Sequence, residues 1–176
     1  MEVFGIQFDS SGIPIGDWVA DSTYPVPPDV TICTQEQANT WQAWTLVSGS
    51  LVQSLTYAKA AQSALIKQGF ANANAANISF TTAAGVTDTY QCDPKSLQAI
   101  QTYLSGFQAA GAVPSGFYWR SATNQNNAFT YADLEKLSQA IAARGFANYN
   151  QLQTLIAKAK AAKKVSAVQA VVWVNP

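Results

Sequence analysis

The sequence predicts an α+β fold: a small three-stranded antiparallel sheet packed against several helices, preceded by an N-terminal β-hairpin arm and a Pro-rich linker. Two β-prone segments, 78–82 and 86–91, flank an Ala-Ala-Gly turn and predict a hairpin. An aromatic run at 117–119 favours the third strand. Apolar residues recur at helical spacing in 97–107 and 131–141, which indicates two amphipathic helices against this sheet.

The stretch 116–141 is the centre of this predicted domain. Its strand ends at an Asn-rich turn, because Asn side chains bond to the nearby backbone and tolerate turn geometry. Thr130 then caps a helix. The apolar stripe of this helix consists of Tyr131, Leu134, Leu137 and Ile141. Together with Trp119, Leu134, Leu137 and Ile141 are predicted to form the main core, opposite a stripe in the preceding helix that consists of Leu97, Ile100 and Leu104.

The N-terminal region is predicted to be an attachment arm. Val3–Phe8 and Ile13–Val19 are short β-prone runs around Asp9-Ser10-Ser11-Gly12, a favourable hairpin turn. Three prolines in four residues then make Tyr24–Pro28 an extended connector and a candidate boundary. Because two strands are marginal alone, residues 1–21 are expected to pack on the body or on a partner. Residues 1–28 are predicted to act as an attachment arm outside the folding unit.

Two tryptophans mark the next segment. Thr34 and Gln37 form a capping-box pattern that predicts a short helix to about Leu46. Trp41 and Trp44 would share one face of it, as core anchors or as a hot spot for a partner. The candidate partner interface consists of Tyr24, Trp41 and Trp44. This arm, residues 1–50, is predicted to precede a domain at 51–176.

A helix is predicted to follow from Leu51 and to stop near Gly69 or somewhat later. The tetrapeptide at Gly69–Asn72 recurs at Gly145–Asn148, which we interpret as a shared helix-end turn. In this reading, Asn148 caps one further helix.

Composition is compatible with a surface that neighbours cover. Charged residues make up 11% of the 176 residues, against about 25% in typical proteins. An ordinary soluble monomer remains the alternative interpretation. The acids of residues 1–50 are Glu2, Asp9, Asp17, Asp21, Asp29 and Glu36, with no Lys or Arg. The basic residues of 137–176 are Arg144, Lys158, Lys160, Lys163 and Lys164, with no acid. These lysines alternate with alanines as on a solvated helix face, so no nucleic-acid partner is predicted.

No catalytic, cofactor or metal site is predicted. His is absent, which removes the commonest general base at neutral pH. Two carboxylate pairs, Asp88 with Asp93 and Asp133 with Glu135, lie at predicted turns or helix starts, where acids serve as caps. Cys33 and Cys92 are predicted to be reduced core thiols. The sequence shows no signal peptide and no apolar stretch of membrane-spanning length, so no membrane association is expected.

The central residues resemble a known family. Trp119-Arg120-Ser121-Ala122-Thr123-Asn124, followed by Tyr131 and Leu134, is similar to the core of DUF4376, a domain of unknown function found in bacteriophage and prophage tail proteins. Upstream similarity lies at Thr87–Tyr90, Asp93 and Ser96–Ile100, and downstream similarity at Leu152, Leu155, Ile156 and Trp173. The resemblance covers roughly 57–174. It departs at Thr123, where the family usually carries Asp.

This resemblance implies a structural function and not an enzymatic one. It suggests a structural component of a phage tail, associated with fibre or baseplate, that forms homo- or hetero-oligomers with other tail or fibre proteins. Such a protein would be assembled in the host cytoplasm and reside in the virion. The alternative is an intracellular tail-fibre assembly chaperone, because the short strands, Pro-rich link and Trp-bearing helix also resemble tail-fibre assembly proteins. An enzyme is not expected.

Overall fold

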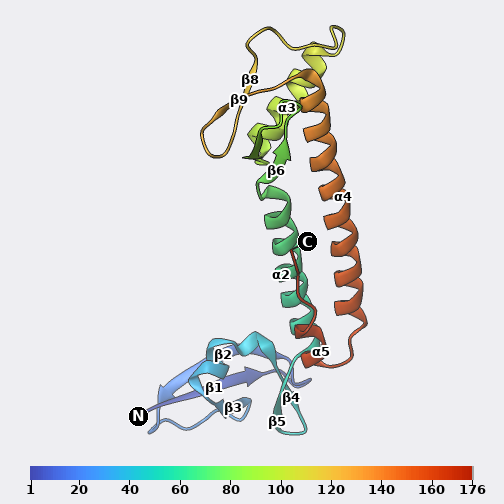
Figure 1. Cartoon of the computed structure of the whole chain (residues 1–176). Helices are drawn as coiled ribbons and strands as arrows, with labels where there is room; N and C mark the ends of the chain where they lie inside the picture. The colour runs from blue at the N-terminus through green and yellow to red at the C-terminus, as the bar shows by residue number, and fades with distance from the viewer. Residues whose placement is uncertain (176) are drawn as a thin grey trace. The chain divides into compact units, whose positions relative to one another are not determined.

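The computed structural model describes residues 1–175 and confirms the α+β class (Figure 1). The chain divides into two compact units. The first comprises Met1–Leu65 and Ile156–Val172, and the second comprises Ile66–Leu155 with the residues from Trp173 onward.

The first unit begins with a three-stranded antiparallel sheet. Its strands are β1 (Glu2–Phe8), β2 (Pro14–Asp21) and β3 (Val30–Cys33), in the order β2-β1-β3. The predicted hairpin is confirmed, and Asp9 Oδ1 accepts the N–H groups of Ser11 and Ile13 in its turn. The third strand is new, and it pairs with β1 across the proline connector. The connector therefore joins two strands of one sheet, which corrects the boundary expected there.

The segment after β3 departs from the predicted helix. The capping box at Thr34 and Gln37 is confirmed, but α1 covers only Gln35–Asn39 and is followed by the 3₁₀ turn η1 (Trp41–Ala43). A hairpin then takes the place of the end of this predicted helix and the first residues of the next one, with β4 (Trp44–Val47) and β5 (Ser50–Gln53). The next predicted helix is itself confirmed, but it covers Leu55–Ala75. Ser48 and Gly49 both have positive φ, as a tight type I′ turn requires.

Helix α2 (Leu55–Ala75) follows β5 and begins in the first unit. The short helix α5 (Val165–Gln169), near the end of the chain, belongs to the same unit. In the first unit, Val168 of α5 and Ala159, near the end of helix α4 (Tyr131–Ala161), are buried. The side-chain amide of Gln62 donates to Val171 O at 2.8 Å, which attaches the segment after α5 to α2.

The second unit contains two hairpins and two helices. The hairpins are β6 (Ile78–Thr81) with β7 (Thr87–Tyr90), and β8 (Tyr118–Arg120) with β9 (Asn126–Ala128). The helices are α3 (Pro94–Phe107) and α4 (Tyr131–Ala161). The three-stranded sheet expected here is wrong in detail: β8 pairs with β9, a strand that was not predicted, instead of joining β6 and β7. Asn124 adopts a positive φ of 64°, which lets the Asn-rich segment fold back on β8.

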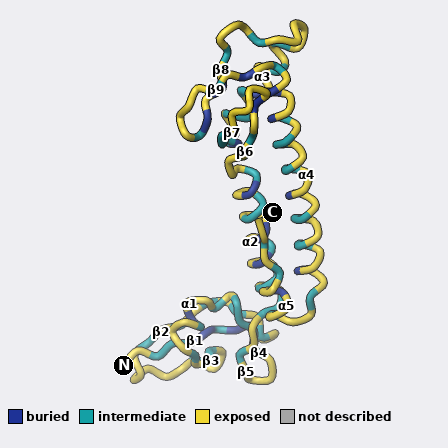
Figure 2. Tube along the Cα trace, viewed as in Figure 1, coloured by how far each residue is buried: buried dark blue, intermediate teal, exposed yellow. Residues whose placement is uncertain are grey.

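The predicted core is confirmed in this unit, except that Leu97 is not part of the cluster. A buried cluster consists of Tyr90, Ile100, Trp119, Phe129, Leu134 and Leu137. Leu104 and Ile141 pack against it as partly buried neighbours. The rings of Tyr90 and Phe129 meet edge to face with centroids 5.2 Å apart. Figure 2 colours the buried stretches of the trace dark blue.

Helix α4 is continuous, so the helix end predicted at its second tetrapeptide is wrong. Gly145 costs a helix only about 1 kcal/mol relative to Ala, and the surrounding alanines favour helix. Asn148 is buried in mid-helix instead of capping a new one. The first tetrapeptide also lies inside a helix, and there Gly69 leaves room for the Trp173 side chain.

Candidate partner-binding site

A groove in the first unit contains one of the predicted tryptophans. Its volume is about 500 Å³. Its lining residues are Thr34, Glu36, Gln37, Thr40, Ala43, Trp44, Gln53 and Tyr57. Among these, Glu36 is the only charged side chain. The groove therefore offers aromatic surface and uncharged hydrogen-bonding groups, which suits recognition of a polypeptide more than acid–base chemistry.

Local structure fixes the two aromatic side chains of this groove. Trp44 begins β4 opposite Gln53, and its indole N–H donates to the Thr40 hydroxyl at 3.3 Å. Thr40 in turn donates to Glu36 O at 2.9 Å, at the end of α1. Tyr57 lies in the first turn of α2, where its N–H donates to Ser54 Oγ at 3.2 Å, and its side chain is 39% exposed.

The structure does not group the three predicted interface residues. Trp41 lies half-buried in η1, on a different element from Trp44, so the shared helix face is wrong. Tyr24 follows β2 and is 67% exposed, but it does not line the groove. Of the three, only Trp44 lines this site.

The three-stranded sheet has an apolar face that was not predicted. Gly5 on β1 lies opposite Trp18 on β2 and Ile32 on β3, so these positions share a face. A Cβ at Gly5 would lie 2.5 Å from Val30 Cγ1 and 3.4 Å from Trp18 Cε3. Glycine therefore lets side chains from both outer strands meet over the central one. A glycine inside a β-prone run is the signal that indicates such an approach.

Two of the acids considered for catalysis, Asp93 and Asp133, serve structural roles. Asp93 is the N-cap of α3 and accepts from the N–H groups of Lys95 and Ser96. Hydrogen bonds from Ser96 lower its pKa. Asp133 is buried; burial raises its pKa, but hydrogen bonds from Thr130 and the Ala83 N–H outweigh this effect and leave the pKa lowered. A depressed pKa suits a permanent acceptor better than a proton carrier.

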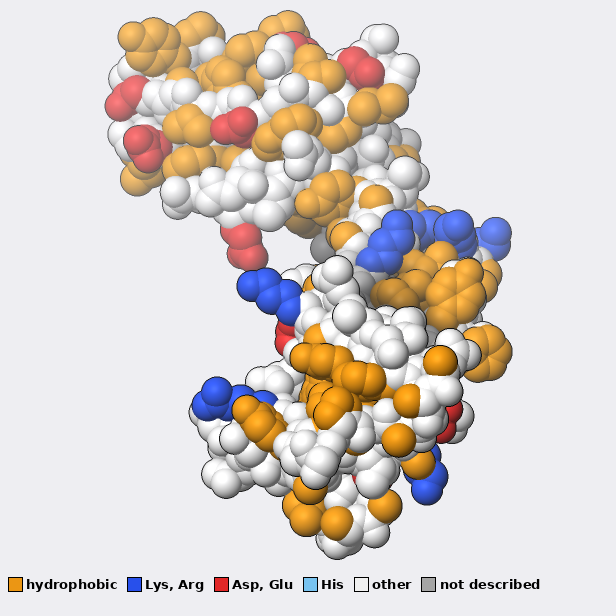
Figure 3. Space-filling view, turned by 90° about the horizontal axis from the view of Figure 1, so that it is seen from above, with side chains coloured by type: hydrophobic (Ala, Val, Ile, Leu, Met, Phe, Trp, Pro, Cys, Tyr) orange, Lys and Arg blue, Asp and Glu red, His pale blue; other side chains and the backbone are white. Residues whose placement is uncertain are grey.

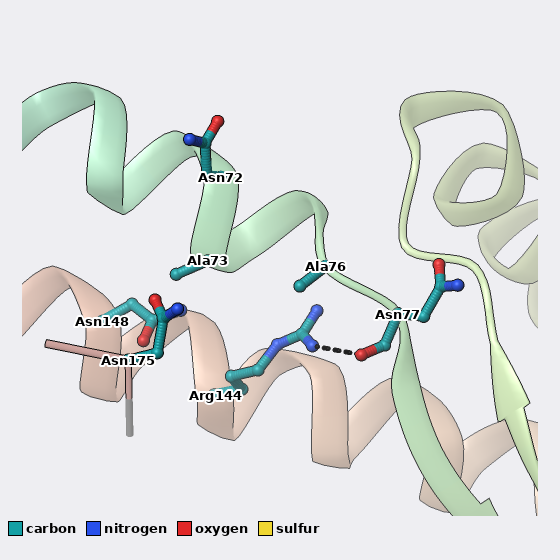
Figure 4. A pocket seen from close by; sticks show the side chains of 7 residues that line it. All are labelled: Asn72, Ala73, Ala76, Asn77, Arg144, Asn148 and Asn175. Carbon is teal, nitrogen blue, oxygen red and sulfur yellow. Dashed lines mark hydrogen bonds between the residues drawn. The ribbon is translucent and has the colours of Figure 1, made fainter.

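A second polar pocket, in the second unit, is formed by an arginine and several asparagines (Figure 4). The Arg144 guanidinium donates to Asn74 O at 3.0 Å and Asn77 O at 3.3 Å, which satisfies carbonyls at the end of α2. Asn148 Nδ2 donates to Asn74 Oδ1 at 2.8 Å, while Asn148 Oδ1 is enclosed and has no partner among residues 1–175. These groups mainly join α2 to α4.

Few charges interrupt the surface in Figure 3, where apolar and uncharged polar side chains predominate. Within residues 1–175 the one ion pair joins the Met1 ammonium to Asp21 at 3.5 Å. No cluster of three potential metal ligands occurs in the described part of the chain. In that same part, no helix combines the length and apolar character needed to cross a bilayer.

A family model matches residues 53–172, and its description is "Domain of unknown function (DUF4376)". The chain belongs to the DUF4376 family. No curated protein and no solved structure is similar enough to count as a match. The DUF4376 match begins within β5, so Tyr57 lies inside it, whereas Trp44 and the three-stranded sheet precede it.

Proposed function

We propose that the chain is a structural component of a bacteriophage tail that joins tail, baseplate or fibre proteins through protein–protein contacts. The tail assignment rests on the resemblance of the DUF4376 region to domains of phage tail proteins. The contact role rests on the groove lined by Trp44 and Tyr57, which presents aromatic surface in a region of low charge. Aromatic anchors in pockets supply much of the binding energy at protein interfaces.

Exposed apolar side chains in the segment that precedes the family match support this role. Besides Met1, they are Ile13, Ile15, Val19, Tyr24, Val26, Ile32, Val47 and Val52. Scattered apolar residues are ordinary on a protein surface, but here acidic residues are their only charged neighbours in the first 50 positions. A partner with an apolar, basic surface would complement this segment in both respects.

The proposal excludes a catalytic role for the acids. Asp93 and Asp133 are engaged as acceptors at helix starts, and the chain has no His. Asp93→Asn and Glu135→Gln should leave biological activity near that of the wild type at permissive temperature. Selective loss of activity with unchanged stability in either variant would contradict this part of the proposal.

Virion composition tests the proposal. Particles from the phage or prophage that encodes the chain should contain it in stoichiometric amount, as measured by quantitative mass spectrometry. Tyr57→Ala should reduce its incorporation, whereas Tyr149→Ala, which removes a 51% exposed tyrosine outside the groove, should not. Absence from virions despite expression in infected cells would overturn the structural role and support an assembly chaperone.

A further inference from the structure

A shallow groove in the second unit lies between α3 and β8. Its volume is about 390 Å³, within the range of about 300–1,000 Å³ typical of small-molecule sites. On the helical wall, Lys95, Ala99 and Tyr103 are spaced by four residues and therefore project from one face of α3. On the strand wall, Tyr118 and Arg120 are two residues apart and project from the same face of β8. Each wall thus carries one cation and one tyrosine.

The tyrosine on the helical wall is held in place by other rings. Tyr103 meets Trp119 edge to face, with centroids 5.8 Å apart and ring planes at 88°. It stacks on Phe107 with an interplanar angle of 7° and meets Phe117 at 5.3 Å. The Tyr103 side chain nevertheless remains 39% exposed. The groove therefore contains a preformed aromatic surface. A ligand that binds there does not bear the entropic cost of ordering the Tyr103 side chain.

The charge of this groove has one sign. Lys95 and Arg120 are exposed and form no ion pair within residues 1–175. The described residues that line the groove include no acid, and they add the uncharged side chains of Gln91 and Ser96. The Asp93 carboxylate lies beside the groove, where it accepts from Ser96 Oγ at 2.7 Å. The two cations of the lining outnumber it, which leaves the groove locally positive in a chain of zero net charge.

We propose that this groove binds an anionic saccharide, a pyranose unit that carries a carboxylate or a phosphate group. The C–H face of the sugar packs on the exposed ring surface of Tyr118 and Tyr103. The planar guanidinium of Arg120 matches the geometry of carboxylate and phosphate oxygens. The Gln91 amide offers a donor and an acceptor to ring hydroxyls. A nucleic acid fits less well, because two cations neutralise few phosphates.

Nuclear magnetic resonance on the purified chain tests this inference without reference to virions. The probes are tetragalacturonate, glucose 6-phosphate, the neutral sugar maltotetraose and a deoxythymidine oligonucleotide. We expect saturable shifts of the Ala99, Tyr103 and Tyr118 amide signals with an anionic sugar, and the comparison of the first two probes distinguishes carboxylate from phosphate. Maltotetraose should bind about tenfold more weakly or not at all.

Matched variants locate the binding. Tyr118→Ala and Arg120→Gln should each weaken binding about tenfold. Tyr149→Ala and Lys136→Gln, which remove an exposed tyrosine and an exposed cation outside the groove, should leave it unchanged. Chemical-shift mapping on the wild-type chain alone can refute the proposal, so the test remains decisive even if a variant fails to fold. Absence of saturable shifts, equal binding of maltotetraose, or tighter binding of the oligonucleotide would each overturn it.

Discussion

The hydroxyl of Thr123 donates to both carboxylate oxygens of Asp88, at 3.0 and 2.9 Å. This contact joins the turn between β8 and β9 to strand β7, and Asn127 Nδ2 adds a second donor at 3.0 Å. The N–H of Ala122 also donates to Thr89 O at 2.8 Å. One carboxylate therefore organises the polar contacts between two hairpins that pair as separate sheets.

Asp88 should make the stability of the chain depend on pH in the acid range. Hydrogen bonds from Ser121, the Thr89 N–H and Asn127 lower its pKa to about 2, whereas an unfolded Asp titrates near 3.9. The folded state thus binds this proton less tightly, so the stabilisation is complete above about pH 4 and is lost as pH falls toward about 2. Urea titrations across this window should show a smaller loss of unfolding free energy for Asp88→Asn than for the wild type. Equal losses would mean that Asp88 does not carry this dependence.

A carboxylate at position 123 should replace the attractive hydrogen bond to Asp88 with electrostatic repulsion. Thr123→Asp replaces a donor with an acid beside Asp88, and two adjacent carboxylates raise the pKa of the pair. The variant should be less stable than the wild type at pH 7, and the difference should shrink as pH falls toward about 5. Thr123→Val removes only the donor, so its deficit should stay constant between these pH values. If the loss of unfolding free energy in Thr123→Asp were also the same at pH 5 and pH 7, the carboxylates at positions 88 and 123 would not be close together.

Truncation of a buried leucine tests the core of the second unit. Leu137 is fully buried in α4, among the residues of the aromatic cluster. Leu137→Ala should cost about 2–5 kcal/mol of unfolding free energy in denaturant melts. Leu65→Ala removes a side chain that is 58% exposed, and it should change stability by about 0.5 kcal/mol or less. Similar effects of the two variants would show that this helix face is not buried.

The core could be predicted from the sequence because its signal is local. Leu134 and Leu137 recur at helical spacing, and Trp119 lies in an aromatic run, so periodicity alone identifies them. The hairpin at β4 and β5 was missed because Leu51 and Leu55 also satisfy a helical pattern. The turn requires a positive φ at Ser48, and serine is only a weak sequence signal for such a turn.

The sites depend on contacts that no local pattern contains. Trp44 lines a groove with Tyr57 because β4 and the start of α2 meet, and the predicted helix would have placed it beside Trp41 instead. The groove between α3 and β8 requires Tyr103 and Tyr118 to converge from separate elements. Glycine inside a regular element, as at Gly5 in β1 and Gly69 in α2, is a local signal of close packing, but it does not identify the partner side chain.

Alanine substitution should have different effects at Gly69 and Gly145, the glycines of the repeated tetrapeptide. A Cβ at Gly69 would lie 2.5 Å from Trp173 Cγ, so Gly69→Ala forces the indole away from α2 and from Phe70, its edge-to-face neighbour at 6.1 Å. A Cβ at Gly145 meets no atom within 4 Å among the described residues, so Gly145→Ala should stabilise the helix by about 1 kcal/mol. The indole N–H signal of Trp173 should move in the first variant and stay in the second. Unchanged Trp173 signals in both would show that the indole does not rest on Gly69.

Deletion of residues 1–28 should disrupt the first unit, contrary to the expectation of a separate arm. The deletion removes β1, the central strand, and with it the buried side chains of Ile6 and Phe8. Strand β3 then loses its only partner in the described sheet, so its N–H groups become free to exchange. Hydrogen exchange should therefore accelerate in β3 and α1, whereas Ile100 and Leu134, in the core cluster of the second unit, should stay protected.

Pro25→Ala is the matched control for this deletion. It alters the connector but keeps both strands, and it leaves the hydrogen bond from Val30 N–H to Pro27 O at 3.1 Å. Loss of one proline costs about 0.4–1 kcal/mol through the unfolded state, without exposing the sheet. Protection of β3 should thus survive Pro25→Ala and disappear in the truncated chain. Full protection of β3 after the deletion would restore the attachment-arm interpretation, because the strand would then be held by something other than β1.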